Sequence, residues 1–347
     1  MTSPAPREIW EDLVTSDPDC LIFQTPAWTD AICSSGPYED ASRLYEGPSG
    51  RRWLLPLIRS RGALPRLSSL SSLPGGCGLG GLIANTPLTG DLLHPVFTDL
   101  EQDPAVRALI RPNPVLSSAW EAAKPGGTTT LALTTHLLDL SGGFEVVWRK
   151  RFHHSTRSAV NKAERSGLAV TVARDASLLP AYYDIFLQWT LRRAAERHLP
   201  GGYALWMARR RDPLLRLQKM VENSGGSARV YVASLDGRPV AAAILFLFKQ
   251  NAVYLRGTSI REIAGPVRAN DLLQSSMIRE ACDAGCRRYH MGTSAGVESL
   301  MRFKHSFGAE PSPLYNYSIE RLPIGQIVAV RNSLLRGIEN QLIRMKI

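Results

Sequence analysis

Residues 228–257 read ARVYVASLDGRPVAAAILFLFKQNAVYLRG, and this stretch decides the fold. Its apolar and β-branched residues fall into three runs, at 228–234, 240–248 and 252–257. Asp236-Gly237 between the first two runs is a strong hairpin signal, and Gln250-Asn251 is a weaker one before the third. The stretch therefore predicts three consecutive strands joined by tight turns.

The elements on either side of this stretch alternate between helix and strand without a regular repeat. Apolar periodicity predicts helices at 178–196, 203–222 and 270–284, and strands at 168–173 and 288–292. Upstream, Trp148, Phe152, Ser155, Ala159 and Ala163 share one face of a long helix that runs from Phe144 to Gly167. This order predicts an α+β fold with a mixed sheet.

The first 143 residues and the last 25 carry weaker patterns. Residues 52–58 and 129–133 predict strands, 75–81 form a glycine loop, and 103–109 and 115–122 predict short helices. The tail at 323–347 predicts an amphipathic helix, which either packs on the protein or lies on a membrane surface.

The charge is divided unevenly along the chain. Up to Trp148 there are 10 Lys and Arg against 16 Asp and Glu, a balance of −6; the remainder carries +16, which gives the total of +10. This asymmetry favours a polyanionic partner for the second half, although an Arg-rich composition alone could produce it. Charge does not distinguish nucleic acid from a phosphorylated cofactor or anionic lipid.

Composition also indicates where the protein works. No run of eighteen uncharged apolar residues is present, and the first eight residues lack the apolar core of a signal peptide. The five cysteines are odd in number and scattered, which is not typical of a disulfide scaffold. We therefore expect a cytoplasmic protein without an integral membrane segment.

Five short motifs occur in a fixed order between residues 135 and 309. They are THLLDL at 135–140, NKAERSGL at 161–168, NDLL at 270–273, GCRRYHMG at 285–292 and LMRFKHSFGA at 300–309. In this order and spacing the chain resembles the Fem-type branch of the GNAT acyltransferase superfamily, the non-ribosomal peptidyl transferases. The resemblance extends from about residue 135 to 320. Before that, only FQTPAW at 23–28 and the glycine loop fit, and both fit loosely.

The resemblance implies two GNAT-like lobes, each with a mixed sheet flanked by helices. We expect an acceptor-side lobe at residues 1–143, a basic donor-side lobe at 144–322 and the C-terminal helix at 323–347. It also implies that an amine of a peptide-like or cell-wall-precursor acceptor attacks an aminoacyl-tRNA to form an amide. The tRNA is then a co-substrate, and no separate cofactor is expected.

Two alternatives to this function stay open. The first is an acyl-CoA-dependent N-acyltransferase on the same fold. The turn at 265–270 lacks the paired glycines that usually hold the CoA pyrophosphate, and Pro266 has no N–H to offer. The second alternative is a non-catalytic nucleic-acid-binding protein that retains the scaffold. The oligomeric state stays open.

Lys304 leads the candidate catalytic residues. By resemblance it matches the lysine that Fem-type enzymes keep at the reaction centre, where a cation stabilises the acyl oxyanion or holds the tRNA 3′ end. His290, His305 and Glu298 are candidate bases, and a terminal ribose hydroxyl could relay the proton instead. His290 stands where the family often has an acidic residue, so a structural role is the alternative.

The remaining candidates bind substrates. Those for the acceptor and the acyl group are Phe303, Asn270, Arg268, Gly76 and Gly78. Those for tRNA phosphates are basic residues of the second half: Arg149, Lys150, Arg157, Lys162, Arg165, Arg209, Arg210 and Arg211. The spacing of His, Asp, Glu and Cys predicts no metal site.

Overall fold

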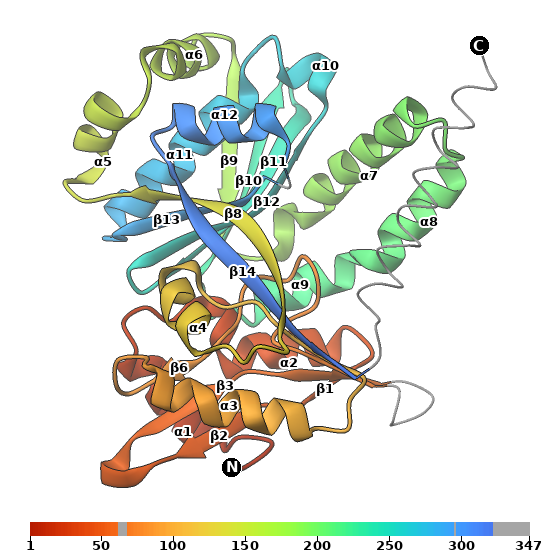
Figure 1. Cartoon of the computed structure of the whole chain (residues 1–347). Helices are drawn as coiled ribbons and strands as arrows, with labels where there is room; N and C mark the ends of the chain where they lie inside the picture. The colour runs from red at the N-terminus through yellow and green to blue at the C-terminus, as the bar shows by residue number, and fades with distance from the viewer. Residues whose placement is uncertain (62–67, 295, 322–347) are drawn as a thin grey trace.

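A computed structural model describes residues 1–61, 68–294 and 296–321, and its strands form two sheets in that part of the chain (Figure 1). In spatial order the large sheet contains β1 (Tyr38–Asp40), β4 (Ile58–Ser60), β5 (Ser69–Ser71), β7 (Arg107–Ile110), β14 (Glu310–Glu320), β8 (Thr129–Asp139), β13 (Arg288–Thr293), β12 (Asn251–Ser259), β11 (Arg238–Phe248), β10 (Ala228–Leu235) and β9 (Leu168–Ala173). The small sheet contains β2 (Arg43–Glu46), β3 (Arg52–Leu55) and β6 (Ile83–Ala84).

The three predicted strands at 228–257 are confirmed as β10, β11 and β12, which pair antiparallel in sequence order. Asp236 and Gly237, with φ of 50° and 77°, form the tight turn between the first two, as the dipeptide predicts. Because β12 pairs with β13 in parallel while its other neighbour is antiparallel, the sheet is mixed. The α+β class is therefore confirmed.

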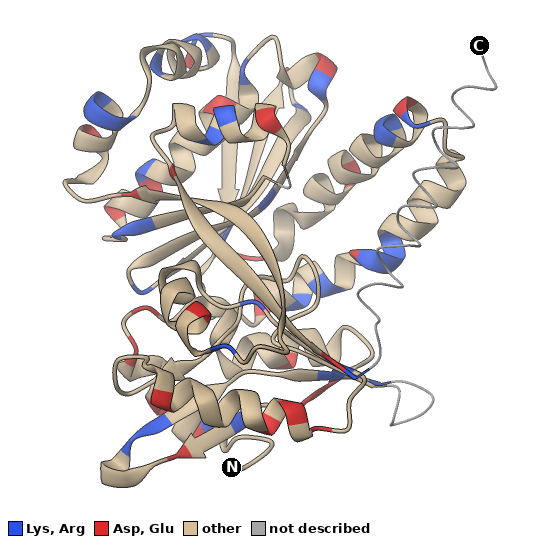
Figure 2. Ribbon diagram, viewed as in Figure 1, with Lys and Arg blue, Asp and Glu red and all other residues tan. Residues whose placement is uncertain are grey.

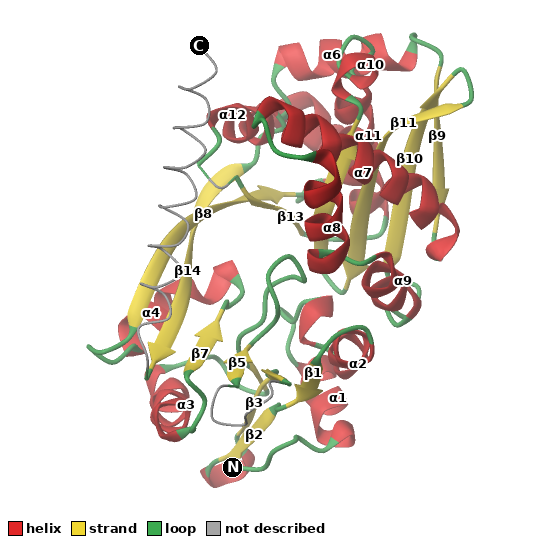
Figure 3. Ribbon diagram, turned by 90° about the vertical axis from the view of Figure 1, so that its right-hand side faces the viewer, coloured by secondary structure: helices red, strands yellow, loops and turns green. Residues whose placement is uncertain are grey.

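Helices cover both faces of the second-lobe sheet. Val230 and Val232 pack into the core formed with α7, whereas Tyr231 and Ala233 pack into the core formed with α11, so alternate side chains point to opposite faces. Figure 3 views the molecule with α7, α8 and α9 toward the reader. The helices of this lobe are α6 (His154–Glu164), α7 (Leu179–Glu196), α8 (Gly201–Arg211), α9 (Leu214–Glu222), α10 (Arg261–Ala264), α11 (Ala269–Asp283) and α12 (Glu298–Ser306).

Two long strands, β8 and β14, connect the lobes. They pair along most of their length, and the end of β14 also pairs with β7 of the first lobe. Tyr317 of β14 is fully buried there against Phe97 and Trp120. A strand from the range expected for the second lobe thus completes the sheet of the first.

The first lobe differs from the sequence-based expectation in two places. Residues 103–109 were expected to be helical, but Arg107–Ile110 is strand β7, because it pairs with β5 and β14. The strand predicted at 52–58 is divided at Pro56 between the two sheets. The helices here are α1 (Arg7–Ser16), α2 (Pro26–Ser34), α3 (Gly90–Gln102) and α4 (Ser117–Ala123), with 3₁₀ turns at Ile22–Gln24, Pro48–Gly50 and Pro114–Leu116.

The prediction of one long helix from Phe144 to Gly167 is wrong, because the helix is interrupted at Phe152. A short helix, α5 (Gly143–Val146), continues into a π-helical turn at Val147–Arg151, and α6 begins at His154. Phe152 leaves the helical path to pack edge-on against Phe307, with ring centroids 4.9 Å apart. The His153 amide donates to the carbonyl of Ser306, so a tertiary contact replaces a helical bond.

Two further predictions concern helices, at residues 203–222 and 323–347. The helix predicted at 203–222 is two helices, α8 and α9, because Pro213 stops the first from continuing. A 3₁₀ turn at Ala176–Leu178 precedes α7. The amphipathic helix predicted at 323–347 lies outside the described residues. Within them, no helix combines the length and the apolarity that crossing a bilayer requires.

Candidate active site

The parallel strands β12 and β13 pair over only three residues and then part. Their register joins Asn251, Ala252 and Val253 to Arg288, Tyr289 and His290, and no further pairs join them in the described chain. A bulge in the β11–β12 ladder near Tyr254 bends β12 at the same level. Beyond Val253 and His290 the two strands diverge, and we call this point the parting of β12 and β13. The last part of β12 and the end of β13 are therefore not hydrogen-bonded to each other, although both strands lie in the middle of the sheet.

Lys304 lies at this parting. It projects from α12 and is buried, and its Nζ donates hydrogen bonds to the carbonyl oxygens of Gly292 (2.7 Å) and Thr293 (2.9 Å) at the end of β13. No carboxylate of the described chain lies within ion-pair distance. Burial therefore lowers the pKa of Lys304 to about 8. An ammonium has three N–H donors, so one is left for a substrate oxygen.

Aromatic packing fixes the helix that carries Lys304. Phe307 is fully buried against Phe152, and Phe303 packs beside Phe307 at 5.1 Å between ring centroids. Phe303 is only partly buried, so it both positions α12 and leaves ring surface beside Lys304.

Buried polar atoms without partners border the same parting. Thr258 Oγ1 on β12 and Ser294 Oγ just after β13 are buried, and the described residues give them no hydrogen bond. His136 on β8 pairs with Gly292 of β13, and its Nδ1 is likewise without a partner. Burial, with the nearby charges of Lys304 and His305, lowers the pKa of His136. Orphaned polar atoms of this kind point to a polar ligand.

The sequence analysis gave none of these three a role. His136 was part of the THLLDL motif, but single Thr, Ser and His residues carry no spacing signal that marks a site. Only the folded chain shows that His136 and Ser294 lie beside the end of β13.

His290 and His305 occupy different environments. His290 is buried, and its Nε2 lies 3.1 Å from Asn251 Oδ1, across the short parallel pairing of β12 and β13. Burial lowers its pKa to about 4, so it is neutral near pH 7. His305 is exposed on α12, and its ring lies edge-on to His153 at 5.1 Å. The geometry therefore favours a structural role for His290.

The start of α11 carries the two remaining candidates of this lobe. Asn270 Nδ2 donates to Ser259 Oγ at the end of β12, which ties the helix start to the parted strand. Arg268, with a φ of 58°, precedes the helix and pairs with Asp271 at 3.0 Å. Burial raises the pKa of Asp271, which lies in the first helical turn. A carboxyl group of the chain itself thus occupies the positive end of α11.

The glycine loop reaches the opposite face of the sheet. The Gly76 carbonyl accepts a hydrogen bond from Arg256 of β12, and Arg256 pairs with Asp212 at 3.0 Å. Although burial opposes it, the two guanidiniums of Arg256 and Arg211 lower the pKa of Asp212. Gly78 packs directly on the ring of Phe23. Gly76 therefore lies at a contact between lobes, and Gly78 packs on Phe23 in the core that both lobes build.

The predicted tRNA-binding residues fall into two groups on opposite faces of the sheet (Figure 2). The first group lies on the π-helical turn that follows α5, on α6 and at the C-cap of α6, and is here called the α5–α6 group: Arg149, Lys150, Arg157, Lys162 and Arg165. All are exposed except Arg157, whose guanidinium donates to the Phe152 carbonyl and so holds the break before α6. The second group, Arg209, Arg210 and Arg211, ends α8.

Comparison with known proteins supports the expected fold. Residues 150–305 match the family described as acetyltransferase (GNAT) domain. No curated protein matches the sequence. The structure resembles FemX with a TM-score of 0.64 and 12% identity, over 90% of this chain and 96% of that one.

Two further solved structures are also similar. L-PGS from Bacillus licheniformis gives a TM-score of 0.54 at 12% identity, over 94% of this chain and 96% of that one. The C-terminal domain of a putative lysylphosphatidylglycerol synthetase from Agrobacterium fabrum gives 0.51 at 17%, over 89% and 92%. At such identities these similarities establish the fold alone. The expected resemblance to the Fem-type branch of the GNAT superfamily is confirmed at that level.

Proposed function

From the premise that the chain is an acyltransferase with the GNAT fold of the Fem-type branch, we propose that it transfers an aminoacyl group from aminoacyl-tRNA to an acceptor amine. The observation that carries this proposal is the buried Lys304 at the parting of β12 and β13. The acceptor is a peptide-like molecule or a cell-wall precursor, in keeping with the similarity to FemX.

In the proposed reaction the neutral acceptor amine attacks the ester carbonyl carbon of the aminoacyl-tRNA. A C–N bond forms and negative charge builds on the carbonyl oxygen, where the free N–H of the Lys304 ammonium donates. The C–O bond to the terminal ribose then breaks, and the proton lost by the amine passes to the ribose oxygen. The 2′-hydroxyl of the same ribose can relay that proton, so the mechanism does not depend on a histidine base.

The two substrates approach from opposite faces of the sheet. The tRNA approaches on the face of α11 and α12, where the α5–α6 group supplies cations for its phosphates. The acceptor approaches on the face of α7, beside Arg256 and the glycine loop. Thr258 and Ser294 border the parting between these faces and offer hydrogen bonds to the reacting groups.

The start of α11 favours tRNA over acyl-CoA as donor. A pyrophosphate needs free N–H groups at a helix N-terminus, but here Asp271 already lies in the first turn and Arg268 pairs with it. The family match to acetyltransferase domains nevertheless keeps acyl-CoA transfer as the second candidate function.

The test combines a substitution with a choice of donor. We expect Lys304→Met to reduce transfer from a charged-tRNA pool by about a hundredfold to a thousandfold. Lys219→Met is the matched control, because Lys219 lies on α9 and pairs with Glu222 at the surface. Ribonuclease should abolish wild-type transfer. Ribonuclease-resistant transfer from acyl-CoA would establish the second candidate, and tight RNA binding without turnover from either donor would indicate a binding protein.

A further inference from the structure

The helices α7 and α8 expose an unusual amount of apolar surface. Eleven large apolar side chains are exposed in the described chain, and five of them lie between residues 189 and 207. They are Trp189, Leu191, Tyr203, Trp206 and Met207, with Trp206 and Tyr203 more than half exposed. Of the residues of α8, only Ala208 is buried. This helix therefore presents apolar side chains to its surroundings instead of to the core.

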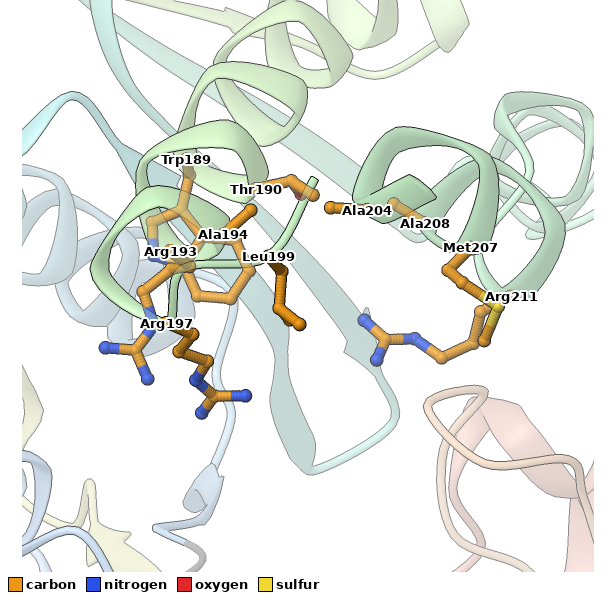
Figure 4. Close-up of a pocket in the computed structure, with 10 residues that line it drawn as sticks. All are labelled: Trp189, Thr190, Arg193, Ala194, Arg197, Leu199, Ala204, Met207, Ala208 and Arg211. Atoms are coloured by element: carbon orange, nitrogen blue, oxygen red, sulfur yellow. The ribbon is translucent and has the colours of Figure 1, made fainter. Parts of the chain in front are cut away.

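A groove separates the two helices (Figure 4). Its volume is about 350 Å³. Trp189 and Leu199 line it on the α7 side and Ala204 and Met207 on the α8 side. Arg193 and Arg197 lie at the α7 side and Arg211 at the α8 side, and no carboxylate lines it. We call this feature, with its exposed apolar residues, the α7–α8 groove.

The groove has a surplus of positive charge. Residues 189–211 contain six arginines and one glutamate. Glu196 pairs with Arg192 and Arg193, and Asp212 pairs with Arg211. Within the described residues, Arg197, Arg209 and Arg210 have no carboxylate partner. Of these, Arg210 lies over the exposed Trp206 ring, so a cation without a carboxylate partner stands beside the apolar surface.

We propose that the α7–α8 groove docks the protein on an anionic phospholipid bilayer. The free energy falls when apolar side chains move from water to the boundary between lipid headgroups and acyl chains. Tryptophan and tyrosine are enriched in proteins at the level of the headgroups. Free arginines beside them meet lipid phosphates. This combination is the chemistry of a membrane-surface site.

RNA explains the groove less well than lipid does. Phosphates would account for the arginines, but not for exposed Leu191 and Met207. The groove also lies on the face opposite the α5–α6 group, to which we assign tRNA. The inference does not depend on the reaction proposed above.

The experiment measures co-sedimentation of the full chain with phosphatidylcholine vesicles, with and without phosphatidylglycerol. We expect binding only with phosphatidylglycerol, and a loss of about tenfold or more in the Tyr203→Ala/Trp206→Ala variant. Leu131→Ala/Val172→Ala, which trims exposed apolar side chains on β8 and β9, is the matched control and should bind like wild type. Arg197→Glu keeps the apolar surface and should also weaken binding, because it reverses a free charge.

A second measurement tests directly whether the α7–α8 groove contacts the lipid. Brominated phosphatidylglycerol should quench tryptophan fluorescence in wild type, and Trp206→Phe should lose part of that quenching. Circular dichroism and thermal unfolding of each variant establish that it is folded. Lys304→Met should bind vesicles like wild type, so that failure of the docking and failure of the transfer reaction are separable.

Three results would overturn the proposal. One is no phosphatidylglycerol-dependent binding by wild type. Another is vesicle binding that survives in the folded Tyr203→Ala/Trp206→Ala variant, which would show that another part of the chain is responsible. The third is loss of total-tRNA binding in that variant without any vesicle binding, which would make the groove an RNA site.

Discussion

At the scale of single residues, the environment of Lys304 determines what it can do. Its ammonium is held by two neutral carbonyl oxygens in a buried site, without a carboxylate to stabilise the charge. A cation in this state is poised between its charged and neutral forms near physiological pH. It is therefore both positioned to meet a developing oxyanion and sensitive to pH.

The first prediction at this scale concerns pH. If protonated Lys304 stabilises the oxyanion, kcat/KM should fall as pH rises above about 8, because the pKa in the folded chain is about 8. Stability should change in the opposite direction. The folded pKa lies below the ordinary 10.5, so the unfolded chain binds more protons between these values and folding becomes more favourable as pH rises.

The measurements are pH–rate profiles and urea unfolding of wild type and Lys304→Met on both sides of pH 8. The variant should lose both the decline in rate and this part of the rise in stability. A wild-type rate that stays level above pH 8 would contradict the oxyanion role.

At the scale of elements, the glycine loop at 75–81 combines two kinds of glycine. Gly78 has a φ of 109°, and a Cβ there would lie 2.4 Å from the Phe23 ring. Gly75 has nothing within 4 Å of such a Cβ and no positive φ. The composition of the loop does not distinguish these positions, whereas the packing of Phe23 does.

This difference gives a prediction with an internal control. Gly78→Ala should destabilise the protein by about 1–3 kcal/mol, because it forces a side chain into a left-handed conformation and onto a fixed ring. Gly75→Ala should change the free energy of unfolding by less than about 0.5 kcal/mol. Urea denaturation of both variants checks this, and equal effects would mean that Gly78 is not constrained by Phe23.

At the scale of the whole molecule, the continuous sheet joins the lobes into one structure. β8 and β14 run through both, and the end of β14 supplies Tyr317 to the first-lobe core. The Arg256–Asp212 pair and the Gly76 carbonyl add a polar contact on the other side. The proposed active site depends on this union, because the two substrates meet at a parting in the shared sheet.

We therefore expect the lobes to unfold in one transition. Amide exchange in β3 and β7, which contribute Trp53, Leu55, Ala108 and Ile110 to the first-lobe core, reports unfolding of the first lobe. Amide exchange in β10 and β11 reports the second. Because β14 supplies Tyr317 to the first-lobe core, and both lobes build the core around Phe23 and Phe246, both probes should give the same urea midpoint. Two separate midpoints would show that the lobes are independent.

The sequence by itself determined the class of the fold and singled out Lys304 as the candidate for the centre of the site. The apolar runs and the turn residues between them predict β10, β11 and β12. An Asp-Gly turn and the two-residue period of burial depend only on neighbouring residues, so the sequence alone reports them. The ordered motifs predicted the GNAT fold, and the Phe303-Lys304 pair within them marked Lys304 as a candidate catalytic residue. Helices α7 and α11 followed from their periodicity to within a residue or two.

Only the tertiary structure determined where the predicted helix is interrupted and which distant residues lie next to each other. The helix expected from Phe144 ends early because Phe152 packs on Phe307, a contact between residues more than 150 positions apart. Arg107–Ile110 is a strand because β5 and β14 flank it, which no local propensity reports. Ser294 and His136 lie beside the end of β13, and Thr258 lies on the part of β12 that is not paired with β13, because the strand pairing sets these positions. The two basic groups occupy opposite faces for the same reason, since a linear charge count holds no information about the side of a sheet.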